Sequence, residues 1–435
     1  MLDRQAPRRA ALLLPLLVVV AAIFWSRPAS AYPWMIRHEY QGCVPCHADP
    51  SGAGLLTAYG RAMGENVLRM RYGSKPPDEP PIYSRFLFGV PEPDWLLVGG
   101  SLRGAEQINV TPGTAATATT PATKTAVSTS FILMEADLRA QVTLGRFRAY
   151  GNLGFIQVPG QDYQITDNTG GNNLVSREYW LGVDLGEDKQ ALLRVGRINI
   201  PFGIRDDNHQ LFVRSSMVTQ TNINDSSQDG LAFSYSGQVL RGEIMAVLGN
   251  YQVNPDAFRQ RGYAGFIEAM VAPKMSVGVS SLVNFAKQDL LSAAYGEGTL
   301  FNTVRQVHGV FARLAPVEPL VLLVEADATI TTANVGTATT PATTAPGFVG
   351  LIEADIEPTQ GLHFIPAVET WIQGDYAQPG AMAMGVVTGK AYSAWAGVLW
   401  FFAPHADFRF DFVATTGVPN APVAYYLLPQ LHLYL

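Results

Sequence analysis

Most of the chain alternates apolar and polar side chains over segments of strand length, and this period of two limits the fold more than any other feature. The segment FILMEADLRAQVTLG places Met134 and Leu138 on one face and Glu135, Asp137 and Arg139 on the other. Successive side chains of a β-strand point to opposite faces, so the alternation predicts strands with one apolar and one polar face. In a soluble sandwich the apolar face would point inward, whereas in a membrane barrel it would point toward lipid.

The number and length of the predicted strands favour the barrel. Strands are expected near residues 94–109, 131–145, 146–158, 174–186, 190–200, 228–236, 238–250, 262–272, 275–286, 303–314, 319–331, 347–357, 360–372, 389–402, 405–415 and 423–435. Sixteen is an even number, and each segment has about the ten residues that a tilted strand needs to cross a bilayer.

The links between these segments alternate between short ones, such as 145–146 and 402–405, and long ones, such as 110–130 and 201–227. Outer-membrane barrels have short periplasmic turns and long external loops. We therefore predict an all-β fold, a 16-stranded antiparallel transmembrane β-barrel in the bacterial outer membrane, in contact with its lipid. The last strand should close against the first, and the N-terminal segment should lie on the periplasmic side or within the barrel lumen.

The N-terminus reads as an export signal. A basic start, MLDRQAPRR, precedes the short apolar run AALLLPLLVVVAAIFW and the small-residue pattern SRPASA. This order predicts a signal peptide over residues 1–31, with an uncleaved anchor as the alternative, although the apolar run is short for a membrane span. Its removal leaves 26 basic and 35 acidic residues, a net charge of −9. That charge argues against a nucleic-acid partner, which would need a basic face.

The only two cysteines, Cys43 and Cys46, stand three residues apart and are followed by His47 in CVPCH. A disulfide across so short a loop would constrain little of the chain, and a zinc site would need a fourth ligand. Cys-x-x-Cys-His is instead the attachment pattern of c-type haem, in which two thioether bonds hold the porphyrin and the histidine binds the iron. The sequence therefore predicts one covalent c-type haem on these three residues, with His47 as the proximal iron ligand.

A second axial ligand is expected nearby. The neighbourhood offers His38, Met35, Met63 and Met70, and residues 54–70 have the apolar spacing of an amphipathic helix. Met63 lies on the apolar stripe of that helix, where a methionine also serves simply for packing. Met63 and His38 are the two candidates for the distal ligand, and the choice between them stays open.

Three similar tetrapeptide patterns place acidic pairs on predicted inward faces. MEAD, VEAD and IEAD contribute Glu135, Asp137, Glu325, Asp327, Glu353 and Asp355. We expect these carboxylates to face the lumen among arginines such as Arg139 and Arg409. They would form either a charge-balanced wall or, in the functional alternative, a lumen that concentrates cations.

The chain resembles the fused monohaem cytochrome–porins, whose best-known members are outer-membrane iron oxidases. The likeness in plan covers the mature chain, and the likeness in motif is confined to IRHEYQGCVPCHADPSGAGLLTAYGRAM. Tyr59-Gly60-Arg61 departs from the iron-oxidase pattern, which indicates a divergent subfamily. A further stretch, LRVGRINIPFGIR, is similar to a strand-and-turn pattern of phosphate-selective porins. The resemblance implies a signal peptide at 1–31, a monohaem cytochrome segment at 32–93 and a porin-like barrel at 94–435.

The function expected from this combination is electron transfer across the outer membrane. The haem would pass electrons between an extracellular one-electron donor or acceptor, with ferrous iron as one candidate donor, and a periplasmic electron carrier such as a cytochrome c. If the donor is a substrate, the protein is an oxidoreductase; the sequence leaves this open. The alternatives are a solute porin with a redox-responsive haem plug and a haem enzyme with an open axial site.

Overall fold

The computed structural model describes residues 32–72 except 41 and 53, 89–113 except 92, 124–155, 174–206, 208, 210–214, 227–251, 256, 259–287, 301–335, 343–373, 389–416 and 423–435. The predicted signal peptide, residues 1–31, lies outside these residues.

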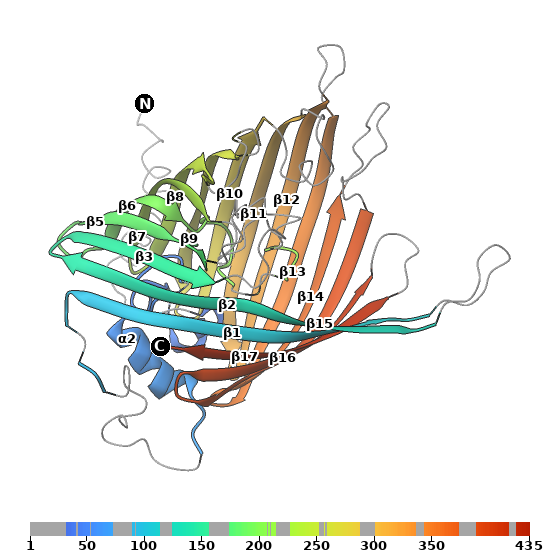
Figure 1. Cartoon of the computed structure of the whole chain (residues 1–435), viewed down its shortest axis with the longest axis horizontal. Helices are drawn as coiled ribbons and strands as arrows, with labels where there is room; N and C mark the ends of the chain where they lie inside the picture. The colour runs from blue at the N-terminus through green and yellow to red at the C-terminus, as the bar shows by residue number, and fades with distance from the viewer. Residues whose placement is uncertain are drawn as a thin grey trace, which may run out of the picture.

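The described strands form one closed antiparallel barrel of 16 strands, as the sequence predicts (Figure 1). They are β1 (Leu96–Thr111), β2 (Ala126–Leu144), β3 (Phe147–Phe155), β4 (Leu174–Val175), β5 (Tyr179–Leu185), β6 (Ala191–Ile198), β7 (Gln228–Ser236), β8 (Leu240–Gly249), β9 (Arg261–Ala272), β10 (Met275–Ala286), β11 (Phe301–Val317), β12 (Leu320–Val335), β13 (Thr343–Thr359), β14 (Leu362–Gln373), β15 (Gly389–Ala403), β16 (Ala406–Thr416) and β17 (Ala424–Tyr434). β4 and β5 both pair with β3 and are two pieces of one strand.

The barrel closes between the first and the last strand, which confirms another sequence prediction. β17 pairs antiparallel with β1, with Tyr434 opposite Ser101 and Leu427 opposite Ile108. The N–H of Leu435 then donates to the carbonyl of Gly100 at 2.9 Å. Closure leaves no unpaired edge among the described strands, which is what a sheet in lipid requires.

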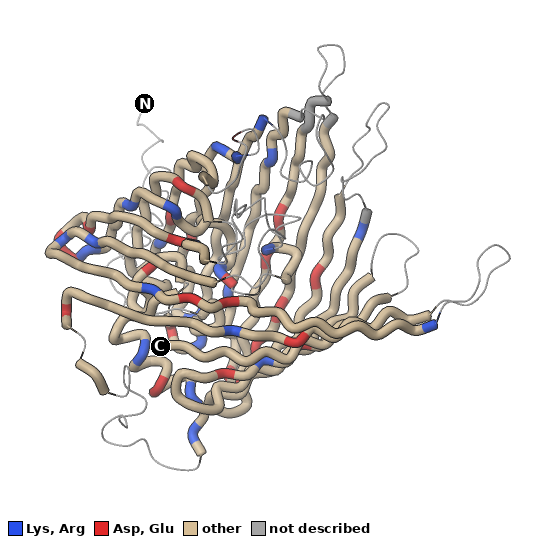
Figure 2. The backbone as a smooth tube through the Cα atoms, viewed as in Figure 1, with Lys and Arg blue, Asp and Glu red and all other residues tan. Residues whose placement is uncertain are grey.

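The two faces of the wall differ as the alternation predicts. Large apolar side chains such as Leu138, 65% exposed, and Val310, 58% exposed, point outward on the described strands. The charged side chains of the same strands are buried inside, and Figure 2 marks their places along the strands. An apolar exterior of this kind suits hydrocarbon, and a polar interior suits a lumen.

The pairing of β1 with β2 contains one irregularity that the alternation did not predict. Arg103 pairs with Glu135, but the next residue, Gly104, pairs with Leu133, so Met134 is an extra residue in β2. Such a bulge shifts the in-and-out alternation by one position. Met134 was expected on the apolar outer face, and that expectation is wrong: it lines a cavity inside the barrel.

Residues 32–72 form a compact segment with three short helices. These are the 3₁₀ helix η1 (Pro33–His38), the α-helix α2 (Ala58–Met63) and the π-helical turn η2 (Gly64–Leu68). The predicted helix over 54–70 is thus confirmed only in part, because the helix begins at Ala58. Thr57 caps its start, since the Thr57 hydroxyl accepts the N–H of Gly60 at 3.0 Å. No helix among the described residues is long and apolar enough to span a membrane.

This segment lies inside the barrel at the end with the short turns. Met70 N–H donates to the Phe401 carbonyl at 2.9 Å, near the turn between β15 and β16. Arg61 Nη2 donates to the Val98 carbonyl at 2.5 Å, near the start of β1. Figure 1 shows α2 beside β1 and the C-terminus. The predicted placement of the N-terminal segment, at the short-turn mouth and in the lumen, agrees with these contacts.

A second stretch of chain also occupies the lumen. The link after β6 was expected to be a long external loop over 201–227, but most of its described residues are buried: Phe202 and Ile204 are each 1% exposed, and Val213 is 0%. Ile204 N–H donates to Glu325 on β12 at 2.9 Å, and Phe212 N–H donates to Glu369 on β14 at 2.6 Å. The expectation of an external loop is therefore wrong for these residues, which fold inward onto the wall.

Candidate functional site

Residues 43–47 form a single tight turn. The N–H of Cys46 donates to the Cys43 carbonyl at 3.1 Å, and the N–H of His47 donates to the same carbonyl at 2.9 Å. Neither thiol is in a disulfide, and both are buried, with 6% of Cys43 and 3% of Cys46 exposed. The Sγ of Cys43 accepts from Nη1 of Arg241 at 3.5 Å. The chain thus holds two thiols and an imidazole within one turn, without a disulfide between them.

Residues 56–60, which follow this turn in the chain, hold it in position through backbone contacts and one hydroxyl. Thr57 N–H donates to the Cys46 carbonyl at 2.9 Å, and the Thr57 hydroxyl donates to the Pro45 carbonyl at 2.6 Å. His47 pairs with Leu56 in an isolated antiparallel bridge. The α-carbon of Gly60 packs so closely against the Cys46 carbonyl that a β-carbon there would clash. The position of the turn is therefore fixed by backbone contacts to α2 and the residue before it.

A buried ion triad fastens the turn to the barrel wall. Asp49, two residues after His47, pairs with Arg194 of β6, and Arg194 also pairs with Glu243 of β8 at 2.5 Å. Asp49 and Arg194 are both 0% exposed. Burial alone would raise the pKa of Asp49, but Arg194 and hydrogen bonds with Glu178 and Ser51 outweigh it, so the pKa lies well below its usual range.

This low pKa predicts that the anchor survives acid. A carboxyl with a depressed folded-state pKa contributes stability above its unfolded pKa of about 3.9, and loses it only as the pH falls through the lower folded value. We expect residues 32–72 of the wild type to resist pepsin at about pH 3. At neutral pH, residues 32–72 of the Asp49→Asn variant should be less resistant to protease than those of the wild type. On acidification the variant should lose less of its resistance, because the other acids are common to both proteins. Equal acid sensitivity of the two proteins would contradict the prediction.

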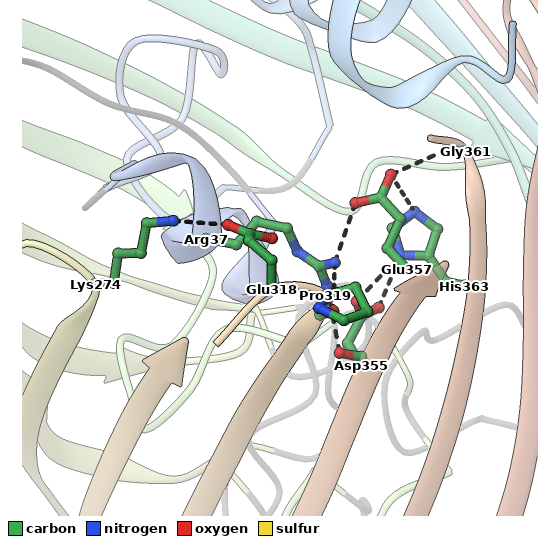
Figure 3. Close-up of polar contacts among 8 residues, drawn as sticks. All are labelled: Arg37, Lys274, Glu318, Pro319, Asp355, Glu357, Gly361 and His363. Carbon is green, nitrogen blue, oxygen red and sulfur yellow. Dashed lines mark hydrogen bonds and ion pairs between the residues drawn. The ribbon is translucent and has the colours of Figure 1, made fainter. Parts of the chain in front are cut away.

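A second anchor joins η1 to the turns of the short-turn mouth (Figure 3). Arg37 pairs with Asp355, and its Nη1 donates to Glu357 at 3.1 Å and to the Pro319 carbonyl at 3.0 Å. Asp355 also contacts Nδ1 of His363 at 2.9 Å. Arg37 and Asp355 are buried, so the pair holds the start of the segment in place.

A cavity of about 170 Å³ lies between the segment and the wall. Cys46, His47 and Met63 line it from the segment, while Arg139 and Tyr434 line it from the wall. A single water needs roughly 10–15 Å³ of such space, so the cavity is an order of magnitude larger than a packing defect. The space beside His47 is large enough to receive a group that the side chains do not fill.

The candidate distal ligands occupy different places. Met63 and Met35 both line the cavity that His47 lines, and the Tyr40 hydroxyl donates to Met63 Sδ at 3.1 Å. His38 is exposed and is not among the lining residues. The Sδ of Met70 accepts from Trp400 Nε1 at 3.3 Å. The structure thus brings Met63, and not His38, to the face of the cavity shared with His47.

The acidic pairs of the wall face inward as expected, and most have a basic partner. Arg139 pairs with Glu135 and with Asp137, the latter at 3.1 Å, and Arg409 pairs with Asp411 at 2.8 Å. Glu325 pairs with Arg214, which comes from the inward-folded link. These pairings favour the charge-balanced wall.

The sequence analysis did not identify Arg194, Arg205 or Arg214 as residues of the site. For the link after β6, which contains Arg205 and Arg214, the only sequence signal was its apolar run INIPFGI.

The comparisons with known proteins bear on the barrel. No protein-family model and no curated protein matches the chain. Among solved structures, OmpT of Vibrio cholerae has a TM-score of 0.54 at 10% identity, covering 80% of this chain and 100% of that chain. A trimer form of OmpT has a TM-score of 0.51 at 10% identity, over 78% of this chain and 99% of that chain. The outer-membrane channel DcaP of Acinetobacter baumannii has 0.52 at 11% identity, over 78% and 97%.

At these identities the likeness is one of fold. The architecture of this barrel is that of the outer-membrane porins, and its outward side chains are apolar where those of a soluble barrel would be polar. The chain is thus a porin-like β-barrel of the bacterial outer membrane, the location that the sequence predicts.

Proposed function

We propose that the protein carries one c-type haem on Cys43, Cys46 and His47 and moves electrons across the outer membrane. The proposal rests on the CVPCH turn lying beside a cavity inside a membrane barrel. Two thiols, an imidazole and a thioether are the donor set that c-type haem uses, so the residues present fit the group. The haem, when bound, would supply a one-electron iron couple. Cys43 and Cys46 would hold it, and His47 would bind its iron.

The surroundings suit electron exchange on two sides. The cavity is lined by Tyr434 and Leu435 at the chain end, near the short-turn mouth, and by Arg205 and Asn208 of the inward-folded link. A periplasmic electron carrier would approach from the mouth. An extracellular one-electron donor or acceptor, ferrous iron among the candidates, would exchange electrons from the opposite side. The wall and the anchors would keep the haem fixed and shield it from lipid.

The test is a visible spectrum of the purified protein in sealed proteoliposomes, recorded before and after ferrous iron is added to the external face. We expect the sharp bands of reduced c-type haem to appear after the addition. A haem that stays oxidised with every external donor, but is reduced from the periplasmic face, would contradict electron transfer from the extracellular side to the periplasm. Protein without covalent haem would refute the central proposal.

Distal ligation gives a prediction with a matched control. Replacing Met63 with alanine should lower the reduction potential and remove the sulfur-to-iron absorption band, because a methionine ligand raises the potential of a His-ligated haem. His38→Ala should leave both unchanged, since His38 lies away from the cavity. If Met63→Ala leaves the band intact, Met35→Leu tests the other cavity methionine. A change in His38→Ala alone would assign the ligand to His38.

One alternative function is supported by a specific observation. Two segments fill the lumen of a barrel with porin architecture, which suits a solute porin with a redox-responsive plug. The buried anchors of Asp49 and Arg37 argue against easy movement of that plug. A conductance that changes on reduction of the wild-type protein in a planar bilayer would favour this alternative.

A further inference from the structure

Arg205, in the link that folds into the lumen, carries a charge with unused donors. The residue is 7% exposed and lines the same cavity as His47 and Met63. Its Nη1 donates to the carbonyl of Ile200. Its Nε and Nη2 are buried and make no hydrogen bond among the described residues. A guanidinium left in this state is costly, because buried donors and buried charges need partners.

The two unused atoms form one binding edge. Nε and Nη2 lie on the same side of the planar guanidinium, and together they donate two parallel hydrogen bonds to a carboxylate. The atom already engaged, Nη1, does not belong to this edge. The structure therefore leaves intact the fork that recognises a carboxylate in bidentate fashion.

Several acids around Arg205 are already engaged by other groups. Asp49 and Glu243, two acids close enough to influence Arg205, both pair with Arg194. Asp206, the next residue, accepts the N–H of Asn208 at 2.7 Å. Arg139, another arginine of the cavity, holds Glu135 and Asp137. Arg205 thus lines the space beside His47, and its Nε and Nη2 are buried without a partner among the described residues.

We propose that Arg205 binds a carboxylate in this cavity, and that this carboxylate is a propionate of the haem. The identity of the ligand rests on the proposed function, whereas the carboxylate chemistry follows from the fork alone. A haem enclosed in the lumen brings two carboxylates into a buried site, and each needs a cation or donors. A small diffusible carboxylate is the other source of the same chemistry. Arg205 would act as a positioning residue that fixes the haem edge and adds positive charge near the iron.

The experiment compares the reduction potentials of haem-loaded wild type, Arg205→Gln and Arg205→Lys at one mildly alkaline pH. Loss of the positive charge stabilises the oxidised, more positive haem, so Arg205→Gln should lower the potential. We expect a change of about tenfold in the equilibrium constant for reduction, equivalent to 59 mV for one electron. Arg205→Lys keeps the charge but loses the fork, and it should recover part of the shift. Arg197→Gln is the control, because Arg197 is also buried, at 1% exposed, but does not line the cavity.

The outcomes separate this inference from the function on which it rests. Wild type without covalent haem would refute the proposed function. Haem attached in all variants, with equal potentials in wild type and Arg205→Gln, would refute only the role of Arg205. An equal shift in the potential of Arg197→Gln would also refute the role of Arg205, because loss of any buried arginine would then lower the potential.

Added acetate should not change the wild-type potential. An acetate effect that Arg205→Gln abolishes would mean that Arg205 binds a diffusible carboxylate and not the propionate. Heat-dependent gel mobility reports whether each barrel is folded. If the Arg205→Gln barrel is not folded, the comparison is made between wild type and Arg205→Lys.

Discussion

Replacing Arg194 with glutamine is expected to free the N-terminal segment from the barrel wall. The substitution leaves the carboxylates of Asp49 and Glu243 buried without their shared cation, 0% and 4% exposed respectively. Breaking a buried pair in this way costs about 3–5 kcal/mol. That energy corresponds to an increase of about a hundred- to several-thousandfold in the population of the detached segment. Protease cleavage of residues 32–72 in the folded barrel would measure it.

A matched control separates loss of an arginine from loss of a partner. Arg313 is buried like Arg194, but its acid, Glu268, is also held by Arg241 at 2.5 Å. Arg313→Gln should therefore leave the segment protected. Adding Asp49→Asn and Glu243→Gln to Arg194→Gln should restore much of the protection, since no unpaired charge then remains. A segment equally protected in Arg194→Gln and wild type would show that the triad is not the anchor.

Deleting residues 32–72 is expected to open a path through the barrel. The segment fills the short-turn end of the lumen, where Trp34, Met35 and Leu68 pack against inward side chains of the wall. A barrel of sixteen strands holds a water-filled channel wherever its lumen is not filled, and the deletion empties the short-turn end. We expect single-channel conductance in a planar bilayer to rise at least about tenfold over the intact protein.

The deletion has its own control and its own contrary result. The double variant Cys43→Ser, Cys46→Ser removes both thiols but keeps the segment, so its conductance should stay low. The pairing of β1 with β17 does not involve residues 32–72, so the barrel should still close in the deletion variant. A deletion variant that conducts no better than wild type would mean that the inward-folded link after β6 blocks the lumen alone.

The parts of this structure that sequence predicts are those with a local cause. Each strand follows from the period of two, because lipid outside and charge inside act on successive residues of the same segment. The grouping of Cys43, Cys46 and His47 is equally local, because the three residues are close together in the chain.

The features that sequence did not predict depend on distant residues. The bulge at Met134 is defined by its register against β1, and no pattern within β2 marks it. The inward course of the link after β6 depends on contacts of Ile204 and Phe212 with acids of β12 and β14, more than a hundred residues away. Arg194 likewise meets Asp49 across 145 residues of chain. The sequence predicted an external loop for this link, because only the closed barrel supplies the surface that buries it.

The anchoring of η1 has a consequence for the order of folding. Neighbouring strands joined by short turns can pair as soon as each hairpin is made, since their contacts are local. Arg37, in contrast, meets its partners on β13 across 318 residues of chain. Closing so long a loop is slow, and here it must wait until most of the wall has been synthesised. The N-terminal segment, although made first, is therefore among the last parts of the molecule to reach its final place.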